Sequence, residues 1–187
     1  TDPSGTIKLE VLVSDIEKAT QFVITIEPKG DTDNIPSDAK ILIGDFNGTS
    51  AQLSFAPVVA DIANVSGQFF LETPTDNENG VDNNNDEFGV WFRDSNGGAG
   101  LSLPALAKGW KYEGWVALDG KTLSTGTFSE TNVTDDGNFY KGSGGAVPTF
   151  PGEDFLVLPS QIPLTGITLP AKVTGRKVFI TIEPFQD

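Results

Sequence analysis

The chain has 187 residues, enough for one large β domain or two small ones, and carries 12 basic against 26 acidic residues for a net charge of −14. This charge repels phosphate backbones and anionic lipid surfaces, so neither nucleic acid nor a membrane surface is an expected partner. Cys, Met and His are all absent, which excludes disulfides, Cys/His zinc sites and catalysis by Ser–His–Asp or Cys–His groups. No run of about 18 apolar residues predicts a membrane span, and a composition free of oxidisable Cys and Met fits an extracellular or cell-surface location.

Short apolar runs bounded by Gly, Pro, Asn or Asp follow one another along the chain and predict β-strands. The first covers residues 6–13, with alternating apolar positions at Ile7, Leu9, Val11 and Val13. The next segment, Ser14–Gln21, is either two turns of helix with Glu17 three positions after a Ser14 N-cap, or a strand connection. The later runs span residues 22–28, 39–46, 51–59, 67–74, 87–94, 111–118, 125–128, 154–159 and 177–184. Many short strands with turn signals between them predict an all-β, immunoglobulin-like antiparallel β-sandwich.

The polar, Asn-rich stretch at residues 73–89 divides the strands into a front set and a back set. We therefore predict a first β unit over residues 1–72 and a second over residues 73–187, with one continuous sandwich as the alternative. A second long irregular stretch, residues 140–155, lies within the back set. Loops of this length in a compact domain usually bind something or stay mobile.

Five residues, I-T-I-E-P, occur twice, at Ile24–Pro28 and at Ile180–Pro184. Each copy places its two isoleucines on one face and Thr and Glu on the other, then ends at a Pro that cannot donate to a strand ladder. Chance convergence of strand sequences is the simpler explanation, but matching apolar and acidic flanks favour duplication. We predict the same strand in two related β units, with both isoleucines of each copy buried and both glutamates near the rim.

Three segments, Tyr112–Phe128, Phe22–Pro28 and Pro36–Phe46, together resemble the extracytoplasmic domain of anti-sigma-K factors. In that family a W-h-x-x-x-G hairpin is accompanied by a G-x-F strand and an h-x-h-E-P strand. The sequence is closer still to secreted, duplicated relatives of that domain, which also carry FPGEDF and TPTD…WF segments. The resemblance implies the fold, through structural rather than catalytic motifs. Because the chain lacks a sigma-binding helical module, a zinc-type Cys/His set and a membrane span, we expect the fold to carry over without sigma-factor regulation.

The acidic loop at residues 76–87 offers oxygen atoms of the kind that calcium binds six to eight at a time. The candidate ligands are Asp76, Glu78, Asp82, Asn84 and Asp86. Their spacing is not that of an EF-hand, because Gly80 and Glu87 fall at the wrong positions for its loop. A solvated turn is the alternative, so the sequence indicates either no cofactor or calcium.

Two further sets of residues are candidate sites at a cell surface. Asn-x-Ser/Thr sequons place candidate glycosylation sites at Asn47, Asn64 and Asn132, each in a turn-like context. Stacking on a sugar ligand is conceivable for Trp91, Trp110 and Trp115. Each tryptophan lies in or beside an apolar run, so packing in the core is the favoured interpretation.

Carboxylates are the remaining candidates for catalysis. A glycosidase-like pair could be drawn from Glu113, Glu153 and Asp154, but the sequence does not place any two face to face. We therefore expect no enzyme. The favoured function is a non-enzymatic extracellular structural or interaction protein; the alternatives are a calcium- or carbohydrate-binding cell-surface module and an envelope sensor related to anti-sigma factors.

By the family pattern, the chain holds the back of one repeat and the front of the next, which leaves sheet edges open at both ends. We expect the chain to bind itself head to tail by strand addition, as a filament or surface matrix. The N-terminal assembly strand would present Ile7, Leu9, Val11 and Val13, and the C-terminal one Val178, Ile180 and Ile182. The rival explanation is a trimmed fragment whose missing strands lie elsewhere.

Overall fold

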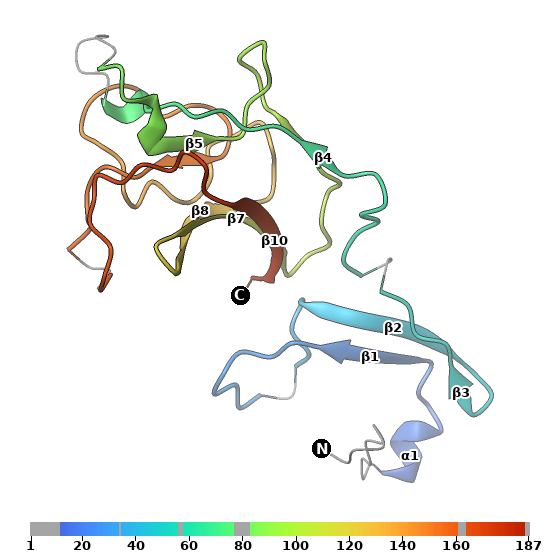
Figure 1. Ribbon diagram of the computed structural model, residues 1–187. Helices are drawn as coiled ribbons and strands as arrows, with labels where there is room; N and C mark the ends of the chain where they lie inside the picture. Colours follow the sequence, from blue (N-terminus) through green and yellow to red (C-terminus); the bar gives the residue numbers. More distant parts are fainter. Residues whose placement is uncertain (1–11, 34, 56–57, 77–82, 161–163, 186–187) are drawn as a thin grey trace.

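The computed structural model describes residues 12–33, 35–55, 58–76, 83–160 and 164–185. Over these residues nearly all regular structure is β, and every paired strand is antiparallel. A small N-terminal lobe, residues 12–55, lies at one end of a larger C-terminal body, residues 58–185 (Figure 1). The predicted all-β, sandwich-like fold class is confirmed.

The N-terminal lobe is a three-stranded sheet preceded by one helical turn. Its elements are α1 (Val13–Ile16), β1 (Gln21–Thr25), β2 (Lys40–Asn47) and β3 (Ser50–Ala51), and its strand order is β1-β2-β3. The predicted strand through Val13 is wrong at that residue, which begins α1. The carbonyl of Leu12 accepts the N–H of Asp15 at 3.0 Å, and this bond turns the chain into a helix. Ile7, Leu9 and Val11 lie outside the described residues.

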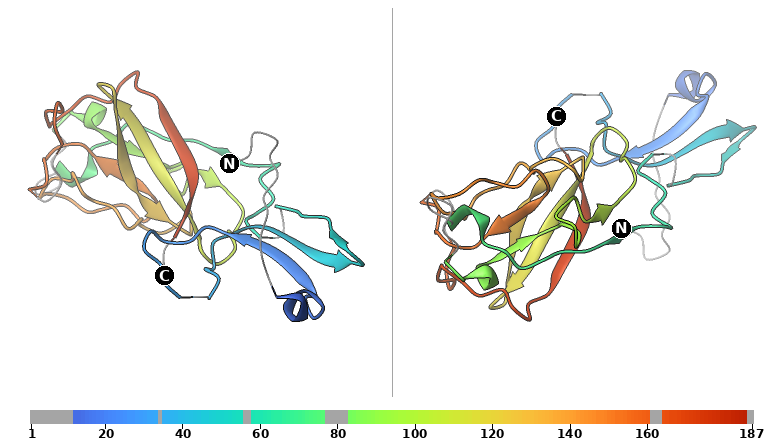
Figure 2. Two further views of the ribbon diagram at one scale, coloured as in Figure 1. Left: turned by 90° about the horizontal axis from the view of Figure 1, so that it is seen from below. Right: turned by 90° about the horizontal axis from the view of Figure 1, so that it is seen from above.

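The C-terminal body contains three sheets, in the orders β10-β7-β8, β4-β6 and β5-β9. Its elements are β4 (Ser66–Gly67), η1 (Pro74–Asp76), η3 (Asp86–Phe88), β5 (Gly89–Trp91), β6 (Leu101–Ser102), β7 (Trp110–Leu118), β8 (Lys121–Phe128), β9 (Gly152–Asp154) and β10 (Val178–Pro184). Figure 2 shows β8, β7 and β10 side by side, with β10 at the margin of its sheet. The predicted boundary at residues 72 and 73 falls between β4 and η1, and β4 pairs across it with β6.

Strict alternation along β7 builds the core of the body. Every second residue from Trp110 to Leu118 is buried, and the residues between them are half-buried on the outer face. The main cluster consists of Val90, Val116, Leu118, Leu123, Tyr140, Phe155, Ile167 and Val173. A fully buried side chain of this size contributes roughly 1.5–3 kcal/mol, so this cluster is the main stabilising element.

A second, smaller cluster joins the lobe to the body. It consists of Ala39, Val58, Val59 and Trp110, with Ile41, Ile43 and Ile182 packed against it. The Trp110 indole N–H also donates to the carbonyl of Lys40 at 3.1 Å. The core prediction is confirmed for Trp91 and Trp110 but wrong for Trp115. Trp115 is half-buried, because side chains alternate along β7 and residue 115 falls on the outer face. There its indole N–H donates to the Thr181 hydroxyl.

The burial prediction for the repeat fails in its first copy. Ile24 and Ile26 are each 37% exposed. The opposite face of β2, with Ile41 and Ile43, packs on the joining cluster, so this face of β1 is turned away from the body. In the second copy, Ile180 and Ile182 share a face with the buried residues of β7 but are only half-buried, because β10 is an edge strand.

Candidate functional site

Strand β10 is paired along one side only. All seven of its residues pair with β7, from Val178 opposite Val116 to Pro184 opposite Trp110. No strand in the described part of the chain pairs with the other edge. An edge strand of this kind is a template for the backbone of another segment.

The direction of the backbone groups of β10 follows from the hydrogen bonds at its two ends. The carbonyl of Lys177 accepts the N–H of Ala117 at 2.9 Å, and the N–H of Phe185 donates to the carbonyl of Gly109 at 2.8 Å. Inward and outward bonding alternate along an antiparallel strand. The backbone groups of odd-numbered residues therefore face β7, and those of Val178, Ile180 and Ile182 point to the open edge.

An apolar groove of about 460 Å³ runs beside this open edge. Its exposed large apolar side chains are Ile62, Val65 and Phe69, at 47%, 46% and 44% exposure, and the buried Phe92 and Tyr112 also line it. Phe69 is held against Phe92 in an edge-to-face contact with 6.5 Å between ring centroids. None of the lining residues is charged, in a chain whose net charge is −14. Exposed apolar side chains beside unpaired backbone groups are suited to binding an extended strand.

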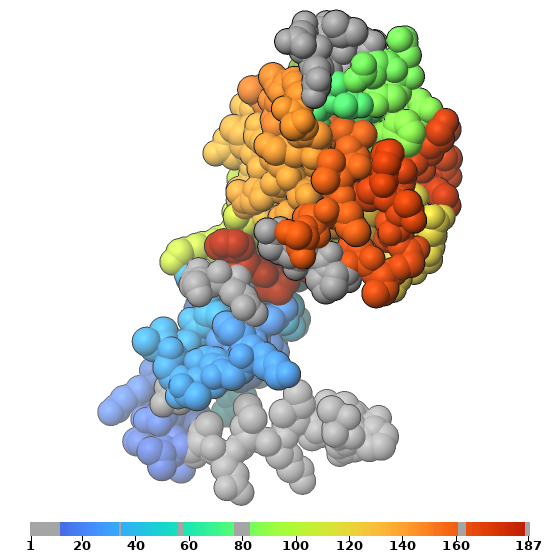
Figure 3. Space-filling view, turned by 90° about the vertical axis from the view of Figure 1, so that its left-hand side faces the viewer, coloured from blue at the N-terminus to red at the C-terminus, as the bar shows by residue number. Residues whose placement is uncertain are grey.

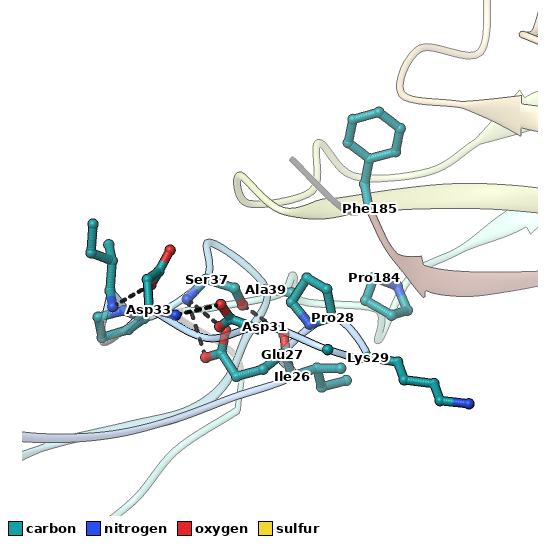
Figure 4. Close-up of a pocket in the computed structure, with 13 residues that line it drawn as sticks. Ile26, Glu27, Pro28, Lys29, Asp31, Asp33, Ser37, Ala39, Pro184 and Phe185 are labelled. Atoms are coloured by element: carbon teal, nitrogen blue, oxygen red, sulfur yellow. Dashed lines mark hydrogen bonds between the residues drawn. The ribbon is translucent and has the colours of Figure 1, made fainter.

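A second pocket, of about 480 Å³, lies where the two I-T-I-E-P copies end (Figure 4). Ile26, Glu27 and Pro28 from the first copy lie on one side. Pro184 from the second copy lies on the other, together with Phe185, the residue after it. The C-terminal end of β10 lies at the junction of lobe and body (Figure 3).

The polar groups of this junction pocket bond within its own loop. The Ser37 N–H donates to both oxygens of Glu27 at 3.2 Å, and the Ser37 hydroxyl donates to the carbonyl of Ile26 at 2.6 Å. The Asp31 carboxylate accepts the N–H of Asp33 at 3.0 Å. These bonds shape the loop between β1 and β2 and engage its polar groups with one another rather than present a set of ligands.

Three buried carboxylates form the most unusual electrostatic feature of the body. Glu153 and Asp154 are 0% exposed, and Asp135 is 7% exposed. Burial raises the pKa of Glu153 to about 8 and that of Asp135 to about 7. Burial also raises the pKa of Asp154. These carboxylic groups are therefore easier to keep neutral than exposed ones.

Hydrogen bonds explain why the fold tolerates these groups. Asp154 accepts the Trp91 indole N–H at 2.7 Å and both the N–H and the hydroxyl of Thr75, at 2.8 and 2.5 Å. Glu153 accepts the backbone N–H groups of Asp154 and Tyr140, at 3.0 and 3.3 Å. The network ties η1 and β9 to the core, which is a structural role.

The three candidate carboxylates, Glu113, Glu153 and Asp154, are only partly brought together. Glu153 and Asp154 are adjacent, but both lie inside the core. Glu113 is on the outer face of β7, where it accepts the Ser124 hydroxyl at 2.6 Å. The structure thus separates Glu113 from the other two instead of placing a pair across a cleft.

The acidic loop is described only in part, since Glu78 and Asp82 lie outside the described residues. Asp76 accepts the side-chain amide of Asn85 at 2.5 Å, and Asp86 begins η3. Over the described residues, no group of three or more His, Cys, Asp or Glu side chains could hold a metal ion. The calcium site, with the candidate ligands Asp76, Glu78, Asp82, Asn84 and Asp86, stays a prediction.

The three sequon asparagines, Asn47, Asn64 and Asn132, are all exposed. Asn47 is the last residue of β2, at the turn to β3. Exposure is what modification requires, and glycosylation of these residues stays a prediction.

Comparison with known proteins returned no match among family models, curated proteins or solved structures. The resemblance to anti-sigma-K factors stays a prediction. In the described ranges, no helix has both the length and the apolar character that crossing a bilayer requires.

The sequence pattern indicates β10 but not the groove wall. Ile62, Val65 and Phe69 lie in the stretch DIANVSGQFF, where apolar residues are spaced irregularly around Gly67. The signal that could have found them is a set of large apolar residues in a segment too polar and glycine-rich for a core strand.

Proposed function

We propose that this protein is a non-enzymatic, extracellular structural subunit that binds further copies of itself by strand addition at the open edge of β10. The observation that carries the proposal is the uncharged apolar groove beside that edge. An enzyme would instead need reactive groups converging on a cleft, whereas the candidate Glu153 and Asp154 are buried in the core and Glu113 bonds to Ser124 on the outer face of β7.

The groove supplies two kinds of stabilising contact. A strand laid beside β10 would cover the three half-exposed side chains of the wall, Ile62, Val65 and Phe69, each worth roughly 1 kcal/mol at this exposure. It would also pair the outward backbone groups of β10, at about 0.5–1.5 kcal/mol for each hydrogen bond. The entropy lost on association offsets part of this gain, so the assembled fraction should depend on concentration.

The two-lobed shape favours an open assembly. Figure 1 shows α1 at the end of the N-terminal lobe that is farthest from the body. The groove belongs to the body. A contact between the lobe of one copy and the groove of the next joins two different surfaces. Such heterologous contacts need not close, and they propagate as filaments.

The test compares two phenylalanines of similar exposure. Phe69 in the groove and Phe139 outside it are 44% and 42% exposed, and each packs edge-to-face on one aromatic ring. Sedimentation velocity over a wide concentration range should show a rising mass for the unmodified chain and for Phe139→Ser. Phe69→Ser should remain monomeric.

A chain that stays monomeric at every concentration would overturn the proposal. Equal loss of assembly in both variants would show that the groove is not the contact. A monomer that gains thermal stability with calcium or with a sugar would support the binding-module alternative instead.

A further inference from the structure

The two I-T-I-E-P copies are held by opposite edges. In β1, Ile24 pairs with Leu42, and the N–H of Ile26 donates to the carbonyl of Ala39 at 2.9 Å. At the other end, the carbonyl of Thr20 accepts the N–H of Phe46 at 3.0 Å. By the alternation of an antiparallel pair, the backbone groups of even-numbered residues in β1 face β2.

The equivalent residues of β10 face the other way. Ile180 and Ile182 correspond to Ile24 and Ile26 in the repeat, and their backbone groups point away from β7 into the open edge. The edge that β1 uses to bind β2 is therefore the edge that β10 leaves open. Conversely, the open edge of β1 matches the edge through which β10 binds β7.

We infer that β10 of one copy binds β2 of a second copy, in the register of the β1–β2 pair, and takes the place of β1 there. This inference rests on the proposed function and names the strand that fills the groove. Leu42 of the second copy would lie opposite Ile180, as it lies opposite Ile24 within one chain. Side chains directly opposite each other in an antiparallel pair point to the same face, so Leu42 would point into the groove.

Strand β1 is the element that can be released at least cost. α1 has no buried residue, and every residue of β1 is exposed or half-buried. β10 is held more firmly, because Val178 packs on the main core and Ile182 on the joining cluster. An exchange at β2 should therefore free β1 and keep β10 in its own sheet.

The apolar surface also fits this exchange. The open face of the lobe carries Phe22 and Ile24, at 36% and 37% exposure, on the same side as Leu42 and Phe46. When β2 extends the sheet of β10, this side of β2 meets the groove wall at Ile62, Val65 and Phe69. Two surfaces that are each half-exposed in the single chain are then covered by each other.

The first test places one substitution in each copy of the repeat. Ile24→Thr weakens the β1–β2 pair that the exchange breaks, and Ile180→Thr weakens the β10–β2 pair that the exchange forms. Because Thr is also β-branched, both strands should persist in these variants. Loss of one apolar cross-strand contact changes such an equilibrium roughly five-fold. By sedimentation velocity we expect Ile24→Thr to raise the association constant by that factor and Ile180→Thr to lower it, with thermal unfolding confirming that both variants fold.

The second test fixes the register by cross-linking. Phe179 corresponds to Val23, which pairs with Ile43 within the chain. Because the chain contains no Cys, only introduced thiols can react. A mixture of Phe179→Cys and Ile43→Cys chains should form a disulfide-linked heterodimer, whereas each variant alone should not; Ile41→Cys, on the same face of β2, is the register control.

The outcomes separate the inference from the proposed function. If every variant and the unmodified chain are monomeric, both fail. If the chain assembles but Ile24→Thr lowers assembly as Ile180→Thr does, the strand exchange is wrong and assembly itself stands. Cross-linking of Phe179→Cys to Val11→Cys in place of Ile43→Cys would likewise identify the N-terminal segment as the donor and overturn the exchange.

Discussion

Replacing Glu153 by Gln should remove much of the pH dependence of stability of this protein. Glu153 is 0% exposed, and its two oxygens accept the backbone N–H groups of Asp154 and Tyr140. The ionised form is disfavoured first by burial and further by the nearby charge of Asp135. Gln has nearly the shape of the protonated acid and stays neutral at every pH. Its amide NH2 must face one of these two backbone donors, a cost that does not depend on pH.

The magnitude follows from the pKa of Glu153, which burial raises from 4.5 to about 8. The folded protein keeps this proton to a higher pH than the unfolded chain does. The associated stability is therefore fully present below pH 4.5 and is lost as the pH rises through about 8. At a pH above both values the loss is on the order of 3–5 kcal/mol, a large share of the stability of a domain this size.

Urea unfolding at pH 5 and at pH 9 tests this reasoning. The free energy of unfolding of Glu153→Gln relative to that of the unmodified chain should be higher by several kcal/mol at pH 9 than at pH 5. Glu113→Gln, on the outer face of β7, is the control and should show no such divergence. The reasoning is refuted if Glu153→Gln changes stability by the same amount at both pH values.

Two further predictions concern salt and backbone space. Raising the salt concentration should increase self-association, because a net charge of −14 repels like copies while the groove is uncharged; dissociation at high salt would instead reveal ionic contacts. Gly152→Ala should destabilise by about 1–3 kcal/mol, since a Cβ there would lie 2.6 Å from the Val90 carbonyl oxygen. Gly97→Ala, with φ +85° and nothing within 4 Å, should cost only about 1 kcal/mol, and equal urea midpoints for the two would contradict the steric argument.

The fold class was predictable because alternation is a local property. In β7 each residue between Trp110 and Leu118 has the burial that a period of two requires. Which face of β1 is buried could not be predicted in the same way. Both faces of the lobe are apolar, and only the packing of Ile41 and Ile43 on Trp110 decides which one is covered.

Of the two parts of the candidate site, strand β10 and the groove wall, only the strand was predictable from the sequence. Strand β10 was indicated by the repeat, and its edge position follows the expectation of open edges. The groove wall arises from tertiary packing of a glycine-containing segment, which carries no periodic signal. The burial of Glu153 and Asp154 could not be predicted from sequence either, because only the fold brings Asp154 to Thr75 and Trp91, far from it in sequence.

The matching of β1 and β10 to one partner strand has a consequence for the order in which the chain folds. β1 and β2 follow each other directly in the chain, whereas β10 comes much later in the sequence and leaves the ribosome after both of them. Local contacts form quickly, and domains begin to fold during synthesis, so β2 is occupied by β1 before β10 exists. A newly made chain therefore begins as a monomer and exchanges only after its first hairpin opens. When full-length chains refold from denaturant at high concentration, β1 and the β10 of a neighbouring chain compete for β2 from the start. Such chains should reach the assembled state sooner than newly synthesised ones.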